Sequence, residues 1–255
     1  MSTRPFFIVG VLSAGLIAAC SSSSNPPPTA AVPSADAAAA AKAALDAKAN
    51  KDLQLYEQMR ANQSWDLAGP LGAELVGKYP DSAAAAKVKE TLDEVRAKAT
   101  AQSESRRLAR LWAYSATPDG GGTQYHASIE SKEPLAPGSN ARDVKRVHLI
   151  LRQHPQWGQS VYLMLDNEKF DCKSGCLTLP VSWDGGPKQP MKATIPPTGE
   201  PALFIDDDKG LIAKILKTKS VAIDVVLKGE GRKTLVFETG GFDAARMPGN
   251  TIKKK

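Results

Sequence analysis

Histidine and cysteine are scarce in this sequence, which limits the metal and thiol chemistry that it can carry. The 255 residues include three histidines and three cysteines, and aromatic residues make up only 6%. No His-x-Glu pair or two-residue spacing joins His126, His148 and His154 into a zinc site. We expect them to be ordinary surface or hydrogen-bonded residues, and we predict no metal ion and no cofactor.

Catalytic motifs are missing as well. No serine lies in a Gly-x-Ser-x-Gly turn, and Asp119-Gly-Gly-Gly-Thr123 lacks the lysine and helix of a phosphate-binding loop. The three consecutive acids Asp206–Asp208 lack the alternating spacing of a calcium loop. We expect them to cap a helix that begins near Lys209. The sequence therefore predicts a protein that is not an enzyme.

The sequence has no strong excess of charge. Its 33 lysines and arginines stand against 27 acids, and Lys253–Lys255 supply half of the net charge of +6. A balance this mild does not favour nucleic acid as a partner. We expect residues 246–255 to form a basic, disordered tail that is solvated.

The apolar run Phe6–Ile17 has 12 residues, too few to cross a bilayer, which takes about 20. It follows Arg4 and suits the core of a signal peptide. It leads into Leu16-Ile17-Ala18-Ala19-Cys20, which resembles the lipobox of bacterial lipoproteins. The resemblance implies that residues 1–19 are a signal peptide and that Cys20 carries lipid, including acyl chains such as palmitate. A plain secretory signal is the alternative.

We expect residues 20–36 to be a disordered tether. Ser21–Ser24 and Asn25–Pro28 cannot bury apolar surface. The residue after Cys20 is serine and not aspartate, which resembles the outer-membrane sorting pattern of Gram-negative lipoproteins. The resemblance implies a lipid-anchored protein on the inner leaflet of the outer membrane, facing the periplasm.

The other two cysteines, Cys172 and Cys176, are four residues apart. In an oxidising compartment we expect them to form a disulfide. Closing so short a loop restrains the unfolded chain by only about 2 kcal/mol. We expect the disulfide to hold a tight turn, with Gly175 supplying the unusual backbone angle.

Residues 37–111 are rich in alanine, leucine, lysine and glutamate, and their apolar residues recur at helical spacing. One apolar face begins at Trp65 and stops before Pro80, and Asp81 or Ser82 is expected to cap the next helix. The pattern predicts a helical hairpin or a three-helix segment.

Part of this region resembles one tetratricopeptide-like helical pair, on the residues Trp65-x-x-Ala68…Leu75…Tyr79-Pro80-Asp81-Ser82…Ala86…Leu92. No second copy follows, so we do not expect a repeat array. The resemblance implies either a hairpin that acts as a stalk or packing partner, or a groove that binds peptides.

From Trp112 the proportion of glycine, proline and β-branched residues increases. This composition predicts that residues 112–245 form a β-rich domain. The expected strands are 124–131, 144–152, 160–165, 176–183, 191–195, 202–205, 220–227 and 233–239. One helix, from about Asp208 to Lys217, interrupts them. The predicted fold class is therefore α+β, with helices followed by a mostly antiparallel, sandwich-like domain. Pro180 predicts that its strand is an edge or is bulged.

The order of these segments resembles the periplasmic β-domains of type VI secretion accessory proteins. It is also distantly similar to the invasion-associated secreted proteins of Gram-negative bacteria. The resemblance covers about residues 110–245 and lies in Val147-x-Leu149-x-Leu151-Arg152, Val181-x-Trp183-Asp184-Gly185-Gly186 and Leu235-x-Phe237-Glu238…Gly241-Phe242-Asp243. It implies a non-catalytic envelope or secretion-linked role.

Two tryptophans lie next to turn signals, Trp157 in Pro155–Gly158 and Trp183 beside Asp184-Gly185. Aromatic side chains in loops can anchor peptides or glycans. We name Trp157, Trp183 and the strand residue Arg152 as candidate binding residues, with core packing as the alternative for both tryptophans. The expected partner is an envelope protein, and peptidoglycan or another glycan is the alternative.

Overall fold

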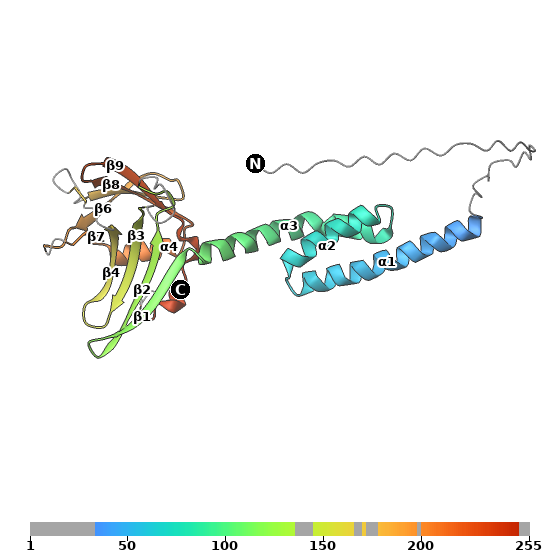
Figure 1. Cartoon of the computed structure of the whole chain (residues 1–255), viewed down its shortest axis with the longest axis horizontal. Coiled ribbons are helices and arrows are strands. Elements are labelled where there is room, and N and C mark those ends of the chain that lie inside the picture. The colour runs from blue at the N-terminus through green and yellow to red at the C-terminus, as the bar shows by residue number, and fades with distance from the viewer. Residues whose placement is uncertain (1–33, 136–144, 166–169, 172–177, 198–199, 250–255) are drawn as a thin grey trace, which may run out of the picture. The chain divides into compact units, whose positions relative to one another are not determined.

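The computed structural model describes residues 34–135, 145–165, 170–171, 178–197 and 200–249 (Figure 1). Cys20, Cys172 and Cys176 lie outside these residues, so lipidation and the disulfide stay predictions. The chain divides into two compact units, Met1–Leu45 and Asp46–Lys255. In the first, the described residues include the start of helix α1 (Ala35–Ala61). No helix in the described ranges combines the length and apolarity that a membrane span requires.

Helices α2 (Trp65–Lys78) and α3 (Ala83–Ala109) form an antiparallel hairpin, against which the second part of α1 packs. The hydroxyl of Ser82 accepts a hydrogen bond from the amide of Ala85 at 3.1 Å, which confirms the predicted cap. Gly72 lets the helices approach closely, because a Cβ there would lie 2.7 Å from the ring of Tyr56. Tyr56 in turn hydrogen-bonds Thr91 at 2.9 Å.

The remaining chain forms a nine-stranded sheet with the order β1-β2-β3-β4-β7-β6-β5-β8-β9, and all its neighbours are antiparallel. The strands are β1 Trp112–Asp119, β2 Gly122–Glu130, β3 Val147–His154, β4 Gly158–Leu165, β5 Thr178–Trp183, β6 Gln189–Thr194, β7 Ala202–Ile205, β8 Val221–Leu227 and β9 Gly231–Phe237. This confirms the predicted α+β class with a mostly antiparallel β-domain.

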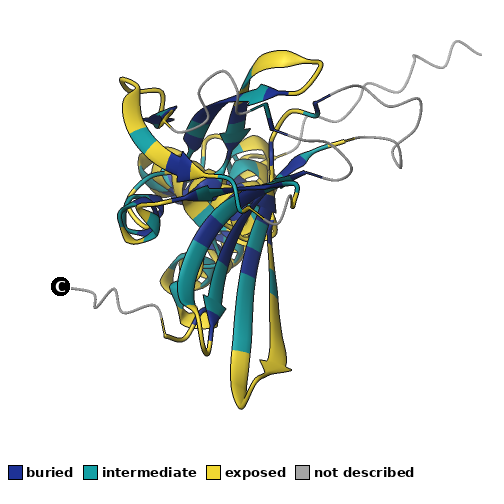
Figure 2. Ribbon diagram, turned by 90° about the vertical axis from the view of Figure 1, so that its left-hand side faces the viewer, coloured by how far each residue is buried: buried dark blue, intermediate teal, exposed yellow. Residues whose placement is uncertain are grey.

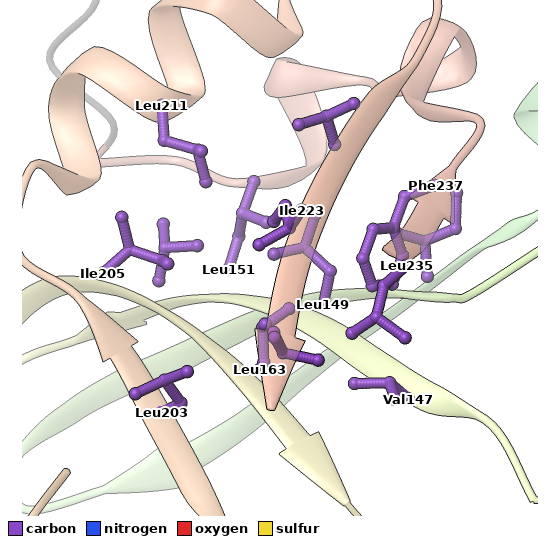
Figure 3. Packing of buried hydrophobic residues seen from close by; sticks show 14 of the residues in the cluster. Val147, Leu149, Leu151, Leu163, Leu203, Ile205, Leu211, Ile223, Leu235 and Phe237 are labelled. Carbon is purple, nitrogen blue, oxygen red and sulfur yellow. The ribbon is translucent and has the colours of Figure 1, made fainter. Parts of the chain in front are cut away.

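The sheet curls on itself at β6, which pairs with β7 at one end and with β5 at the other. The two parts face each other across one apolar core, and Figure 3 shows side chains of β3, β4 and β7 meeting those of β8 and β9. The residues labelled there are Val147, Leu149, Leu151, Leu163, Leu203, Ile205, Leu211, Ile223, Leu235 and Phe237. Burial of such side chains contributes about 1.5–3 kcal/mol each.

Helix α4 (Asp208–Ile215) adds Leu211, Ile212 and Ile215 to this core. The side chain of Asp207 accepts a hydrogen bond from the amide of Gly210 at 2.9 Å. The acidic run therefore caps the helix, as the sequence predicts.

Two details differ from the predictions. Strand β5 is not an edge, because it lies between β6 and β8; its ladder with β8 begins at Val181, so Pro180 faces a partner only on the β6 side. The predicted tail also begins later than residue 246. Met247 is only 1% exposed within the core, and the guanidinium of Arg246 lies 4.1 Å from the ring centre of Tyr114.

Candidate functional site

The outward face of β2, β3, β4 and β7 brings together one arginine, a histidine, a serine and several aromatic side chains. The residues between them in each strand point into the core, so alternation turns this set outward. His126, Arg152 and Ser160 are direct neighbours across β2, β3 and β4. Tyr162 and Phe204 are neighbours across β4 and β7. With Trp157 from the β3–β4 turn, we call this set the arginine–aromatic surface.

Trp157 is 71% exposed, but its position is fixed from beneath by His154, which is 2% exposed. The two rings stack with centroids 3.9 Å apart and planes 15° apart. The Nδ1 atom of His154 accepts the amides of Gln156 and Trp157 at 3.0 and 3.2 Å. Its other nitrogen, Nε2, is therefore assigned the proton and donates to Asp119 at 3.1 Å. The β3–β4 turn therefore exposes the indole ring of Trp157 and also holds it in one position.

Arg152 lies among the aromatic rings of this surface. Its Nε donates to the hydroxyl of Ser160 at 3.1 Å. Its guanidinium carbon lies 5.6 Å from the ring centre of Trp157 and 5.6 Å from that of Tyr162, both within cation–π range. Tyr162 stacks on Phe204 with 4.9 Å between ring centres. Over the described ranges, Arg152 has no ion pair with a carboxylate.

Arg152 carries the positive charge of the arginine–aromatic surface, because the other basic side chain in the set, His126, is neutral. Burial, and then the charge of Arg152, hold the pKa of His126 below its ordinary value of 6.5, which keeps this imidazole neutral at pH 7. Burial also raises the pKa of Tyr162, so its hydroxyl stays protonated. The Nε2 atom of His126 is buried and finds no hydrogen-bond partner in the part of the chain that the structure describes.

Of the three predicted binding residues, the structure brings together Trp157 and Arg152. Trp183 is not part of this surface, because its ring packs against the core and faces the ammonium group of Lys214 at 5.3 Å. Sequence reasoning did not single out His154 as the support of Trp157. The signal available for it was a His-Pro-x-Trp turn between two alternating strands.

A separate cavity of about 550 Å³ lies beside the ends of β1, β2 and β3. Its acidic groups are already paired: Glu130 lies 3.5 Å from Arg146, and Glu238 accepts a hydrogen bond from Arg107 at 2.7 Å. We therefore assign it no ligand. The described residues also contain no group of three or more histidine, cysteine or acidic side chains placed to hold a metal ion.

No protein-family model matches the chain, and no curated protein matches it. Among solved structures, one similar chain is the invasion associated protein B from Bartonella henselae, with 15% sequence identity and a TM-score of 0.35. The match covers 53% of this chain and 87% of that one.

Proposed function

We propose that the chain is a membrane-anchored envelope lipoprotein that binds a protein partner through the arginine–aromatic surface and does no catalysis. Support for the location comes from the lipobox-like residues before Cys20 and from the Ser- and Pro-rich tether. Support for binding comes from the exposed aromatic and arginine side chains of the β-domain. The secretion-linked role implied by the order of its segments is one setting for such a partner.

The observation that carries the proposal is the exposure of Trp157 on a fixed support. A side chain that is already ordered loses little conformational entropy when a partner covers it. Tryptophan, tyrosine and arginine are also the residues that most often dominate the binding energy of protein interfaces. Trp157, Tyr162 and Arg152 meet on this surface, with 5.6 Å between the guanidinium and each ring.

A glycan is the second candidate, and the same exposed indole favours it, because a flat ring also packs well against an apolar ligand face. In this alternative the chain would be an envelope module that binds peptidoglycan. Co-sedimentation of the purified chain with isolated murein tests it. The protein-partner proposal predicts that the chain stays in the supernatant.

The protein-partner proposal is tested by affinity capture from intact envelopes. We expect Trp157→Ala to lose a partner protein that the unchanged chain captures. Leu67→Ala is the matched control, since Leu67 is also strongly exposed, at 60%, but belongs to α2. If Trp157→Ala captures the partner as well as Leu67→Ala does, an interface centred on Trp157 is excluded. Sedimentation with murein that depends on Trp157 would favour the glycan.

A further inference from the structure

Arg152 offers more hydrogen-bond donors than its surroundings use. Its Nε donates to Ser160, but its two terminal nitrogens make no hydrogen bond with any residue that the structure describes. The groups around it are aromatic rings, a hydroxyl and an imidazole. A half-buried guanidinium in such surroundings is electrostatically complementary to an anion.

The outward neighbours of Arg152 on the adjacent strands are polar side chains. Ser115, His126, Arg152 and Ser160 form one outward row over β1, β2, β3 and β4. Adjacent strands are about 4.8 Å apart, so a ligand at Arg152 is also within reach of His126. The Nε2 atom of His126 is buried and is not exposed to a ligand, so we count only the terminal nitrogens of Arg152 as donors to a ligand at this row.

The two aromatic rings close to Arg152 favour some anionic ligands over others. In an extended peptide, side chains two residues apart point the same way and are about 6.8 Å apart. This spacing is close to the 5.6 Å from the guanidinium carbon to the ring centres of Trp157 and Tyr162. A carboxylate flanked by apolar side chains at the second position on either side therefore fits. Nucleic acid fits poorly, because the residues of the arginine–aromatic surface include one arginine and no lysine, and not a basic stripe.

We infer that the arginine–aromatic surface binds an extended acidic peptide segment with the pattern apolar-x-acidic-x-apolar. The carboxylate accepts two hydrogen bonds from the terminal nitrogens of Arg152, and the apolar side chains cover the rings of Trp157 and Tyr162. This inference rests on the proposed function, since it names the chemistry of the partner at the same surface.

Two fluorescein-labelled nonapeptides test the inference by fluorescence anisotropy with the full-length chain in detergent. Both carry phenylalanine at positions three and seven; one has aspartate at position five, and its twin has asparagine. We expect the aspartate peptide to bind about tenfold more tightly, which is typical of one charge-assisted contact. Arg152→Gln should remove the difference. Arg152→Lys should keep only part of it, because lysine cannot form the two parallel bonds.

Arg232→Gln is the matched control, because it removes the same charge from an exposed position on β9. It should leave the tenfold preference intact. Thermal unfolding by circular dichroism checks that each variant folds. Equal binding of the two peptides, or an aspartate preference that survives Arg152→Gln, overturns the inference. Binding of N-acetylmuramic acid without binding of either peptide overturns it in favour of a glycan.

The two proposals fail in different ways. If Trp157→Ala abolishes capture from envelopes while both peptides bind equally, the partner does not use a carboxylate and only the further inference falls. If Trp157→Ala leaves capture unchanged, the proposed function itself falls.

Discussion

The imidazole of His154 stacks on the indole of Trp157, with 3.9 Å between their ring centres. Both nitrogens of the imidazole are also used, one by two amides of the turn and the other by Asp119. One nearly buried residue therefore fixes the backbone of the turn and the position of the exposed ring. The binding surface depends on a side chain that need not contact the ligand.

Replacing His154 should loosen this turn. In His154→Ala, two amides and Asp119 lose a partner, and we expect the free energy of unfolding to fall by about 2 kcal/mol. His154→Asn is the control, because its side-chain oxygen can replace the Nδ1 acceptor; it should lose less. Urea unfolding followed by circular dichroism measures both. Equal stability of the alanine variant and the unchanged chain would contradict the role given to His154.

The close contact at Gly72 makes a second prediction, on the helical hairpin. In Gly72→Ala the new methyl group meets the ring of Tyr56, and overpacking of this kind costs about 1–3 kcal/mol of unfolding free energy. Gly77→Ala is the matched control in the same helix, because a Cβ there would have no neighbour within 4 Å apart from the adjacent residues and the backbone of its own helix. Alanine favours helix, so this variant should be unchanged or up to about 1 kcal/mol more stable. Thermal unfolding of the two variants compares them directly.

The ion pair between Arg107 and Glu238 predicts a dependence on pH. The hydrogen bond from Arg107, opposed by burial, holds the pKa of Glu238 below its ordinary value of 4.5. A carboxyl whose pKa is lower in the folded state stabilises the fold above its unfolded pKa, and this contribution is lost as the pH falls through the folded value. Unfolding free energy should therefore decrease below about pH 4.5.

Glu238→Gln should reduce this acid sensitivity in urea unfolding measured from pH 7 to pH 3. In an Arg107→Gln background the same change should have little further effect, because the partner that lowers the pKa is gone. An unaltered pH slope in Glu238→Gln would show that other carboxyls account for the acid sensitivity.

The predicted anchor is tested by Cys20→Ser. Without the thiol no lipid can be attached, so the variant should leave the membrane fraction and lose label from radioactive palmitate. Ser21→Ala is a suitable control, since it leaves the acceptor thiol in place. Retention of the Cys20→Ser chain in membranes, with its label, would contradict lipidation at this residue.

Much of the fold was predictable because it depends on local patterns. Alternation in Val147, Leu149 and Leu151 marks a strand with one buried face, and the acidic run before α4 marks a helix start. Strand β1 was not predicted as a separate element. It is an exposed strand beside β2 at one end of the sheet order (Figure 2), and an exposed strand needs no alternation of apolar residues.

The candidate surface was only partly predictable, because it depends on strand register. Trp157 and Arg152 stand out in the sequence through residue type and neighbouring turn signals. His126 opposite Arg152, and Phe204 opposite Tyr162, become neighbours only once the strands pair. Phe204 is 52 positions from Arg152 in the sequence, so no local signal connects the two residues.

Photo-crosslinking in living cells can show whether position 157 contacts a protein partner, with a photoreactive phenylalanine derivative in place of Trp157. Irradiation is followed by immunoblotting against the chain, and the same derivative in place of Leu67 is the control. We expect a discrete protein adduct from position 157 that is absent from position 67. No protein adduct at position 157, or the same adducts from both positions, would contradict the proposed protein interface.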